Sequence, residues 1–560
     1  MPLLFLESKD DAAISKQKGI TAPLARNAAV ANGPGTAVNK TLTSVSDRPV
    51  LEHIQSGSSM SSISRINTAS SDPDNILWPF RVKHLGHEVY TLFAKSENER
   101  SAWCTKIIEA KEQHARALHA QNAEPFRLRV LADGAFAYDS FSVAGKAPGV
   151  AIQGTPLDRA IREIEQVYGT SRPPPVCRAL VNCGTTFTAF GKSLIAIGTD
   201  YGVFISEASN PRGWTRVSLK QPTLYSDGML TMPLKSVQIS RVTQIAVLEE
   251  FSVCLVTADR SLIAYPLEII APTSNFPASG NDSARKAPQR LAKDVTFFAT
   301  ARMKERTLVF YKRKEGMHTT FKVLEPVFQR SSEKRPRIFG GRRGGAGSTE
   351  TFRDFDEFYL PTECYSLNLF QSYIAVATAK GFEMLTLDKK HTMSVPSGLN
   401  MPAIANIANR IRDQRPLGMF KLNDQEFLLA YEDCAVYVDK HGEISRTLIM
   451  EYSGKQKKAR GATMFGQYLL LFNEDYVEVR NAENGRLRQI VAGRDVRVLD
   501  QGCRGPTGLG GVGAGAVTAG SADSKGTVKI AMSHPESKPG SPGVQIVLEL
   551  LLNDGHDKAT

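Results

Sequence analysis

Short apolar runs separated by turn signals recur along most of the chain. One example is "LIAIGTDYGVFI" (194–205), in which two apolar runs flank a polar Gly-Thr-Asp-Tyr-Gly segment. The same arrangement returns in four further segments, "CLVTADRSLIAY" (254–265), "YIAVATAKGFEML" (373–385), "FLLAYEDCAVYV" (427–438) and "LLLFNEDYVEV" (469–479). Runs of this length, rich in β-branched and aromatic residues and bounded by turn residues, predict paired β-strands.

The spacing of these turns predicts a mainly β protein with a β-propeller. After Val176 the sequence reads almost entirely as short strands, and the turns follow one another at intervals of about 40–60 residues. A strand repeat of that length, without helices between, is typical of four-stranded propeller blades, and we expect seven of them. The strands are apolar on both faces because neighbouring blades stack face to face. A sandwich or barrel is the second choice, because it lacks this longer period.

One segment interrupts the strand pattern. "SLKQPTLYSDGMLTMPLKSVQ" (218–238) separates "GWTRV" from "ISRVTQIAVLEE". It is either a surface loop between strands or untranslated sequence that was read through in gene prediction. The local composition does not decide between these two interpretations.

The N-terminal part of the chain has a different pattern. "WPFRVKHLGHEVYTLFA" (78–94) predicts a β-hairpin, because alternating residues flank a Leu-Gly-His turn. The next segment predicts a helix over about 96–119 that begins with a capping box of Ser96 and Glu99. "PLLFLES" (2–8) predicts an earlier strand.

Trp103, Ile107 and Ala110 share one face of this helix, so we expect Trp103 to be buried against the sheet. Residues 22–76 are rich in Ala, Ser, Thr, Gly and Asn, and we expect them to be disordered.

Residues 121–175 are expected to connect the two regions. "PFRLRVLADGAFAYDS" predicts strand, turn and strand, and a short helix follows over 155–168, with Thr155 as its N-cap. The stiff "SRPPPV" (171–176) predicts a domain boundary.

Composition limits the class of protein. A chain of 560 residues that is 42% apolar can bury more than one core. Its longest apolar runs reach only about half of the ~20 residues that a membrane span requires. The seven cysteines are scattered without a Cys-x-x-Cys pair, which favours a reducing compartment. We therefore expect a soluble, cytoplasmic protein, with the cell cortex or plasma-membrane periphery as a further location.

The net charge of +12 does not indicate nucleic-acid binding. Basic residues concentrate in loop-like tracts such as "SSEKRPRIFGGRRGG" (331–345) and "GKQKKARG" (454–461). No predicted helix has a basic face, and no basic stretch alternates with aromatic residues, so nucleic acid is not an expected partner. An acidic protein, or weak contact with an anionic membrane, is compatible with this charge.

Motifs for catalysis and cofactor binding are missing from the sequence. It contains no H-E-x-x-H, no Cys/His ligand cluster and no G-x-S-x-G. "GLGGVG" (508–513) satisfies the dinucleotide pattern, but the following "AGAVTAGSADSKG" does not predict the helix that this motif requires. We therefore expect no catalytic residues, no cofactor and no metal.

A hairpin followed by one capped helix resembles the C-terminal half of a pleckstrin homology (PH) domain, a seven-stranded barrel closed by a C-terminal helix. The residues that carry this resemblance are 78–120, together with the strand at 2–8. The sequence leaves no room before Met1 for the first strands of the barrel, whose basic residues bind phosphoinositides in many PH domains. Arg81 and Lys83 are the remaining candidate lipid contacts.

A second resemblance, to the citron homology (CNH) domain, a propeller-like interaction module, is carried by "SLIAIGTDYGVFISE", "RVTQIAVLEEFSVCLVTADRSLIAYPLE", "DEFYLPTECYSLNLFQSYIAVATAKGFEMLTLD" and "CAVYVDKHGEISR". A partial PH domain ahead of a CNH domain resembles the C-terminal region of fungal Rho guanine-nucleotide exchange factors. In that family a Dbl homology (DH) domain precedes the PH domain and catalyses exchange. That domain is absent here, so the chain resembles a fragment, or a gene model that begins at an internal Met.

The resemblance implies a regulatory, non-catalytic interaction module in small-GTPase signalling. Its expected partners are a Rho-family small GTPase, an upstream kinase or a membrane-anchored signalling protein. The expected plan has three parts. Residues 1–120 form a partial PH domain with a disordered insert at 22–76, and residues 121–175 form a connector with a short helix at 155–168. Residues 176–553 form a CNH propeller with a flexible excursion at 503–525.

The alternative is a propeller-fold hydrolase or lyase with its site in the central channel. Clustered carboxylates and histidines along that channel would favour the enzyme. An apolar or mixed lining would favour the interaction module.

Overall fold

The computed structural model describes residues 4–9, 11–15, 76–85, 89–133, 153–160, 163, 180–200, 202–208, 210–216, 219–220, 236–237, 241–271, 288–315, 318–327, 351–454, 457–502, 526–535 and 545–556. Almost all of the expected insert 22–76, the whole excursion 503–525 and most of the segment 134–179 lie outside these residues. The chain divides into two compact units, Leu3–Lys111 and Glu112–Thr560.

The first unit is an antiparallel sheet with one helix. The central strand β3 pairs with β4 along one edge and with β1 and β2 along the other. The elements of this unit are β1 (Leu4–Ser8), β2 (Ile14–Ser15), β3 (Ile76–His84), β4 (Val89–Ala94) and α1 (Glu97–Ala120). The predicted hairpin, helix and earlier strand are therefore confirmed.

The start of α1 shows the predicted capping residues in use. The Glu99 backbone N–H donates to Ser96 Oγ at 3.1 Å. The Glu99 carboxylate accepts from the backbone N–H of Lys95 at 2.8 Å, one residue before the position that a capping box uses. Both contacts occupy groups that would otherwise lack a partner at the helix N-terminus.

The prediction that Trp103 is buried is wrong, because its side chain is 53% exposed. The buried face of α1 is rotated by one residue, and Cys104 packs with Leu6, Phe80 and Val82 of the sheet. Arg100 is also buried, and its guanidinium donates to the carbonyl of Asp11 at 2.7 Å. Long polar side chains therefore occupy part of the face that apolar periodicity assigned to Trp103.

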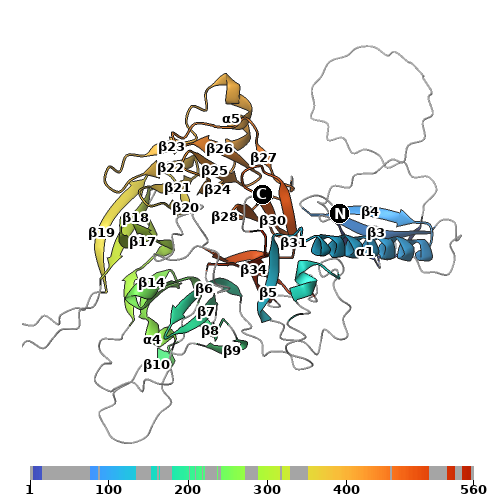
Figure 1. Cartoon of the computed structure of the whole chain (residues 1–560), viewed down its shortest axis with the longest axis horizontal. Helices are drawn as coiled ribbons and strands as arrows, with labels where there is room; N and C mark the ends of the chain where they lie inside the picture. The colour runs from blue at the N-terminus through green and yellow to red at the C-terminus, as the bar shows by residue number, and fades with distance from the viewer. Residues whose placement is uncertain are drawn as a thin grey trace, which may run out of the picture. The chain divides into compact units, whose positions relative to one another are not determined.

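Among its described residues, the second unit contains seven four-stranded antiparallel sheets, which confirms the predicted seven-bladed propeller (Figure 1). We number the sheets as blades in the chain order of their first strands. Blades 1 to 3 comprise β6 (Val181–Ala189), β7 (Lys192–Thr199), β8 (Gly202–Glu207) and β9 (Asn210–Arg216); β12 (Val242–Leu248), β13 (Val253–Ala258), β14 (Ser261–Pro266) and β15 (Gln289–Ala292); and β16 (Val295–Met303), β17 (Arg306–Glu315), β18 (His318–Pro326) and β19 (Phe352–Leu360).

Blades 4 to 7 repeat this order, except that the fourth strand of blade 7, β5, comes from earlier in the chain. They comprise β20 (Cys364–Leu369), β21 (Ile374–Thr378), β22 (Gly381–Leu385) and β23 (Met393–Val395); β24 (Pro416–Lys421), β25 (Glu426–Tyr431), β26 (Cys434–Asp439) and β27 (Met450–Glu451); β28 (Gly461–Phe465), β29 (Tyr468–Phe472), β30 (Tyr476–Asn481) and β31 (Leu487–Ala492); and β32 (Arg497–Gln501), β33 (Val528–Ser533), β34 (Gln545–Leu552) and β5 (Phe126–Asp133).

Hydrophobic clusters join the blades into a ring. Among the described residues, six clusters each join a blade to the next one, from blade 1 to blade 7. A seventh cluster joins blade 7 to blade 1. In β13, for example, Cys254 and Val256 face blade 1, whereas Val253 and Leu255 face blade 3. Because side chains alternate across a strand, a strand between two neighbours must be apolar on both faces.

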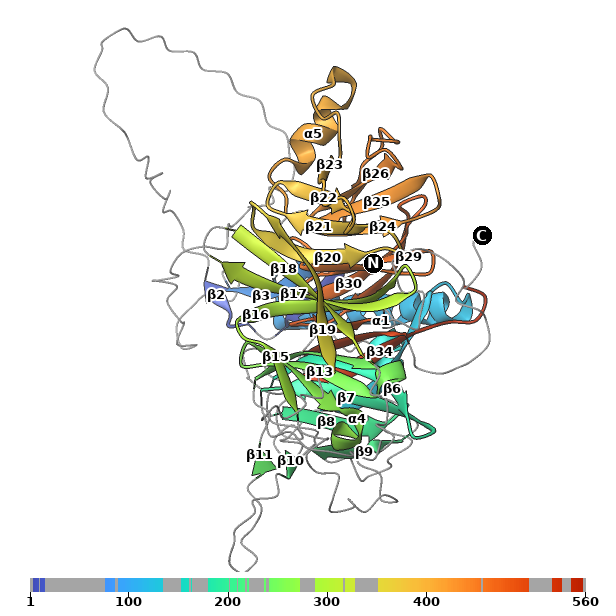
Figure 2. The same ribbon diagram turned by 90° about the vertical axis from the view of Figure 1, so that its left-hand side faces the viewer.

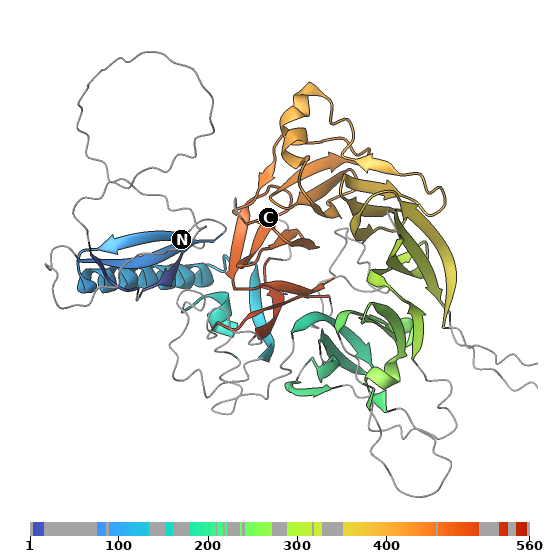
Figure 3. The ribbon, with the colours of Figure 1, turned by 180° about the vertical axis from the view of Figure 1, so that it is seen from behind.

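Blade 7 combines the two ends of this unit. Strand β34, the predicted "VQIVLELLLN" strand, pairs with β33 on one side and with β5 on the other. In Figures 1 and 3, light-blue β5 therefore lies beside the red C-terminal strands. The sequence assigned residues 126–133 to a connector, whereas in the structure they form the outer strand of the last blade.

The repeated segment of the sequence, two apolar runs around a turn, forms a β-hairpin within a blade. In "LIAIGTDYGVFI", β7 and β8 pair up to Thr199 and Gly202, and Thr199 Oγ1 donates to the Gly202 carbonyl at 2.9 Å. Thr378 and Gly381 repeat this contact at 3.0 Å in blade 4. Gly381 has a φ of +115°, which favours glycine. The turn residues are thus required by the backbone, and the flanking apolar residues by the neighbouring blades.

Several short strands and helices are not part of the seven blades. They are β10 (Leu219–Lys220) and β11 (Ser236–Val237), which pair with each other, together with α4 (Leu267–Ile270), α5 (Ala405–Ile411), η2 (Glu249–Phe251) and η4 (Pro402–Ile404). The ends of the interrupting segment 218–238 therefore form a small two-stranded sheet, and its middle lies outside the described residues. Helix α5 lies at the outer rim near β23 (Figure 2) and buries Ile407 and Ile411 between blades 4 and 5.

The second predicted helix is present in part. Residues 156–160 are helical, and the Asp158 backbone N–H donates to Thr155 Oγ1 at 3.4 Å, as expected for an N-cap. Leu157 and Ala160 pack into the cluster between blades 6 and 7. Most of the remaining predicted length, up to residue 168, lies outside the described residues.

Candidate functional site

The first strands of five blades line a central cavity of about 460 Å³. These strands are β6, β12, β16, β20 and β32, from blades 1, 2, 3, 4 and 7. Hydroxyl and amide side chains lie among apolar ones along the wall, and the described residues that line it include no histidine. The lining is therefore mixed, as expected for the interaction module rather than for the enzyme alternative.

Of the described residues, two with carboxylates line this cavity, and both carboxylates have structural partners. Glu249 accepts the backbone N–H of Thr188 at 2.9 Å, from the neighbouring blade. Asp500 accepts the backbone N–H of Gly502 at 2.9 Å and pairs with Lys529 at 3.2 Å. A general base must be in contact with the proton that it removes, and these oxygens already bind backbone and lysine groups.

Amide side chains in the cavity wall connect one inner strand to the next. Gln244 Nε2 donates to the Phe298 carbonyl at 2.9 Å, and its Oε1 accepts the Phe298 N–H at 2.8 Å. Asn368 accepts the Met419 N–H at 3.1 Å in the same way. Asn182 Nδ2 donates to the Val242 carbonyl at 3.0 Å, and outside the cavity lining the Arg497 guanidinium donates to the Val181 carbonyl at 2.8 Å. The polar lining thus satisfies buried backbone groups at the blade junctions.

A chain of charged side chains crosses blade 7 from its outer to its inner strand. Arg129 on β5 donates to Glu549 on β34 at 2.8 Å, and Glu549 contacts the Thr527 hydroxyl. Lys529 on β33 donates to the Thr527 carbonyl at 2.9 Å and pairs with Asp500 on β32. Lys529 and Glu549 are fully buried. Removal of one member would leave a buried charge without compensation, so this chain of contacts ties β5 to the blade.

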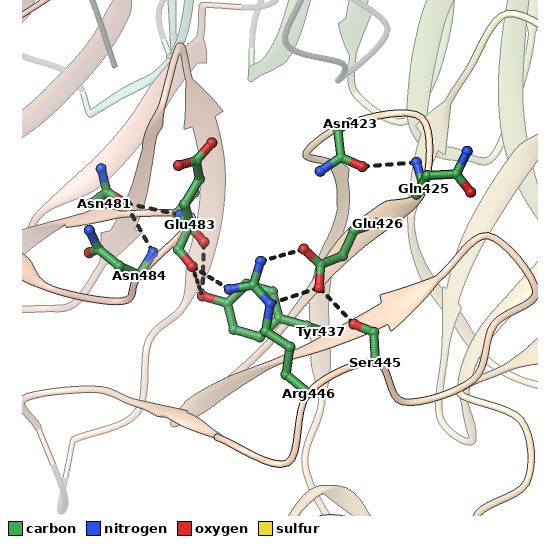
Figure 4. A network of polar contacts seen from close by, with 10 residues as sticks. Asn423, Gln425, Glu426, Tyr437, Ser445, Arg446, Asn481, Glu483 and Asn484 are labelled. Atoms are coloured by element: carbon green, nitrogen blue, oxygen red, sulfur yellow. Dashed lines mark hydrogen bonds and ion pairs between the residues drawn. The ribbon is translucent and has the colours of Figure 1, made fainter. Parts of the chain in front are cut away.

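A second network joins blades 5 and 6 (Figure 4). Arg446 Nε donates to Glu426 Oε1 at 2.7 Å, and the guanidinium lies 3.9 Å from the ring centroid of Tyr437. The Tyr437 hydroxyl donates to the Ala482 carbonyl at 2.9 Å, and Arg446 also donates to the Glu483 carbonyl. Burial raises the pKa of Tyr437 to about 12, so its hydroxyl stays protonated and donates. This network also connects blades and presents no reactive group.

The buried cysteines lack thiolate character. Cys254 is fully buried, and burial raises its pKa to about 12. Burial also raises the pKa of Cys183, which lines the cavity. Protonated thiols are weak nucleophiles and weak metal ligands. Within the part of the chain that the structure describes, no group of three His, Cys, Asp or Glu side chains could hold a metal ion.

The two candidate lipid contacts lie next to each other on β3 but differ in exposure. Arg81 is exposed, and its guanidinium pairs with the Asp11 carboxylate at 2.9 Å. Lys83 is half-buried and lies opposite Phe5 and Val89 in the sheet. The Asp11 contact compensates the charge of Arg81, and lipid binding by either residue stays a prediction. None of the helices that the structure describes is long and apolar enough to cross a membrane.

Sequence analysis did not identify the residues that form the two networks. Lys529 and Glu549 could have been noticed, because each is a lone charge inside an apolar strand, in "TVKIAMS" and "QIVLELLL". Such residues are rarely buried unless they are paired. Arg446 and Glu426 carry no comparable signal, because both lie among other polar residues of the sequence.

A ring of four-stranded sheets, whose channel groups hold strands and blades together, defines a β-propeller. The model of the CNH domain matches residues 191–502, more than half of the chain. The chain belongs to the CNH domain family. The match omits β5, β33 and β34, so the blade that closes the ring lies largely beyond it.

The curated relatives of this chain are fungal exchange proteins. "Rho1 guanine nucleotide exchange factor 3" of Schizosaccharomyces pombe is 29% identical over 450 residues, which are 75% of this chain and 32% of the relative. "Rho1 guanine nucleotide exchange factor 1" of the same species is 28% identical over 321 residues, 56% of this chain and 21% of that protein. "RHO1 GDP-GTP exchange protein 2" of Saccharomyces cerevisiae is 23% identical over 312 residues, 55% of this chain and 21% of that protein. The chain thus spans a third or less of the length of these relatives.

Two solved structures align with about two thirds of this chain. The "AfRom2 CNH domain" aligns with 67% of this chain and 95% of its own, at 24% identity and a TM-score of 0.45. The WD40 domain in "Structure of the Neurospora crassa Pan2 WD40 domain" aligns with 66% of this chain and 89% of its own, at 10% identity and a TM-score of 0.35. The family assignment rests on the sequence match.

Proposed function

We propose that this chain is a regulatory interaction module of Rho GTPase signalling. It holds a Rho-family GTPase, or a kinase or membrane-anchored signalling protein, close to a guanine-nucleotide exchange domain. The observation that carries this proposal is the 450-residue similarity to a Rho1 exchange factor, which is longer than the CNH match itself. The exchange chemistry belongs to the whole relatives, of which this chain corresponds to a part.

The physical role of such a module is to raise effective concentration. A linked binding module turns the second encounter into an intramolecular one and increases the apparent affinity without new chemistry. A ring with seven apolar junctions suits this role, because a rigid surface loses little conformational entropy when it binds. The cavity also supports a role as an interaction module, since Glu249 and Asp500 are engaged in contacts between and within blades.

Direct binding tests this proposal. The chain is immobilised, and a fungal Rho-family GTPase is offered in its GDP-bound, GTP-analogue-bound and nucleotide-free states, with a Ras-family GTPase as the control. We expect saturable binding of at least one Rho state and none of the control. Equal binding of both GTPases, or binding of neither, would contradict a Rho-family GTPase as the partner.

We also propose that the first unit derives from a PH domain and that the protein works in the cytoplasm at the cell periphery. The strand and helix order of this unit supports the first statement. A fluorescent fusion tests the location, and sedimentation with vesicles containing anionic lipid tests the lipid contact. Loss of vesicle binding in Arg81→Glu and Lys83→Glu variants would assign that contact to β3, whereas unchanged binding would exclude these two residues.

A further inference from the structure

The basic tract at 454–461 lies in the connection between blades 5 and 6, and its described part leads into β28. The backbone N–H of Ala459 donates to the Glu432 carbonyl at 2.7 Å, and that of Arg460 donates to the Phe472 carbonyl at 2.7 Å. These contacts fix the connection to the β25–β26 hairpin of blade 5 and to the β29–β30 hairpin of blade 6. The described part of the tract is therefore held against the propeller.

The turns of these two hairpins bring acidic residues to the same face of the ring. Strands of an antiparallel blade alternate in direction, so the turn between the second and third strands lies at the same end as the connection to the next blade. Lys458 meets Glu432 of the blade 5 turn at 2.8 Å, and Arg460 meets Glu474 of the blade 6 turn at 2.9 Å.

Two further ion pairs lie on this face. Lys457 pairs with Asp475 of the blade 6 turn at 2.6 Å. Arg410, from the connection between blades 4 and 5, pairs with Asp433 of the blade 5 turn at 2.8 Å. We call the four basic side chains the basic surface: Arg410, Lys457, Lys458 and Arg460.

The basic member of each pair is the more exposed one. The side chains of Lys458 and Arg460 are 51% and 61% exposed, whereas those of Glu432 and Glu474 are 22% and 38% exposed. The other two pairs show the same difference. The carboxylates thus lie beneath the cations. An ammonium has three N–H donors and a guanidinium has five, so each cation keeps donors for a second carboxylate.

We propose that the basic surface docks an acidic segment of a partner protein. Carboxylates of such a segment form charge-assisted hydrogen bonds with the outward N–H groups. The carboxylates beneath already hold the long basic side chains in place, so docking costs less conformational entropy. The inference rests on the proposed function and deepens it, because it names a surface of the module and the chemistry of the partner.

An anionic membrane fits this surface less well than an acidic protein segment. A membrane attracts basic residues through the charge that they present at a distance, up to about a Debye length. Each cation of the basic surface has a carboxylate partner, so this distant charge largely cancels. At contact distance the remaining donors still bind a carboxylate that a partner protein places on them.

A labelled acidic peptide tests this inference on the full chain. The probe is a fluorescein-labelled peptide in which Glu alternates with Ser, and in the control peptide Gln replaces each Glu. Anisotropy should rise with the acidic peptide only, and the affinity should fall as salt is added, because salt screens exposed charges. The double variant Lys458→Gln, Arg460→Gln should bind about fivefold more weakly, because two of the four exposed cations are lost.

Three further variants control for charge and folding. Lys389→Gln with Lys440→Gln removes the same charge from turns between third and fourth strands, at the opposite end of the blades, and should leave the affinity unchanged. Lys458→Arg with Arg460→Lys keeps the charge and should retain binding. Arg410→Gln, on a different connection, should weaken binding as well. Unchanged circular dichroism of each variant confirms that it folds.

Three results would overturn the inference. They are no binding of the acidic peptide, equal binding by the two glutamine double variants, and a loss of binding to phosphatidylserine vesicles in Lys458→Gln, Arg460→Gln while peptide binding is unchanged. The peptide assay contains no GTPase, so its failure is distinct from a failure of the proposed function.

Discussion

Truncation of Phe126 tests whether β5 is part of the propeller. Its side chain is fully buried in the cluster between blades 6 and 7, although it lies outside the region that matches the CNH family. Its ring packs edge to face on Phe465 at 5.5 Å and on Tyr468 at 5.6 Å. Its backbone N–H and C=O each bind the Gln489 side chain at 2.8 Å. If β5 were a mere connector, none of these contacts would affect the blades.

The structure sets the size of the effect. Truncation of a buried phenylalanine to alanine costs about 3–5 kcal/mol, because apolar burial is lost and a cavity remains. The two edge-to-face contacts place Phe126 in the upper part of this range, at about 4–5 kcal/mol. A cooperative unit of roughly 400 residues unfolds with an entropy of about 2 cal/mol/K per residue, so the melting temperature should fall by about 5 °C.

The assay compares Phe126→Ala with Phe190→Ala in the full chain. Phe190 lies at the turn between β6 and β7 and is 46% exposed, so the same truncation should cost well under half as much. Urea unfolding followed by circular dichroism gives the free energies, and scanning fluorimetry gives the melting temperatures. Equal destabilisation by the two substitutions would refute the assignment of β5 to blade 7.

Three further predictions follow from the same contacts. Deletion of residues 540–560 removes β34 and should unfold the second unit; a deleted chain with an unchanged melting temperature would disprove closure of the ring. Lys529→Ala should destabilise this unit by about 3–5 kcal/mol in urea, because Asp500 loses its buried partner, and a loss below about 1 kcal/mol would show that the network is dispensable. Burial lowers the pKa of Lys111 from 10.5 to about 8, so the folded first unit releases a proton that the unfolded chain still holds between those pH values. Its stability should therefore rise by up to ~3 kcal/mol from pH 8 to 10.5, and Lys111→Met should remove this rise in pH-dependent denaturant titrations.

Local strand pairs could be predicted from the sequence, whereas ring closure could not. The β7–β8 hairpin carries its own turn and its own apolar residues within twelve positions, so its pattern is complete in one short segment. Strand β5 has a partner far away in the sequence: Arg129 and Glu549 are separated by 420 positions. No turn joins them, and an isolated strand pattern does not indicate which sheet it completes.

The buried face of α1 shows a second limit. Trp103 and Cys104 differ by about 100° around the helix, and Ile107 is compatible with either face. The choice depends on Arg100 and Lys111, whose stems are buried while their charged ends reach backbone carbonyls of the sheet. Apolar periodicity counts such residues as polar, so the buried face that it predicted for the helix is rotated by one residue from the observed face.

Of the candidate site, only the mixed polar and apolar character of the channel lining could be predicted from the sequence. The mixed channel follows from inner strands that carry Thr, Asn and Gln between apolar residues. The pairing of Lys529 with Asp500, however, depends on two strands that the excursion 503–525 separates in sequence. Contacts between charged residues of this kind appear only when the blades are assembled.

One titration tests the central claim most directly. A fungal Rho-family GTPase loaded with fluorescent GDP is mixed with increasing amounts of the chain, and anisotropy and nucleotide release are followed in the same cuvette. A binding module without exchange chemistry predicts a saturable rise in anisotropy, with release no faster than in buffer. Release accelerated several-fold would contradict the non-catalytic assignment, and unchanged anisotropy at saturating amounts would contradict the GTPase as partner.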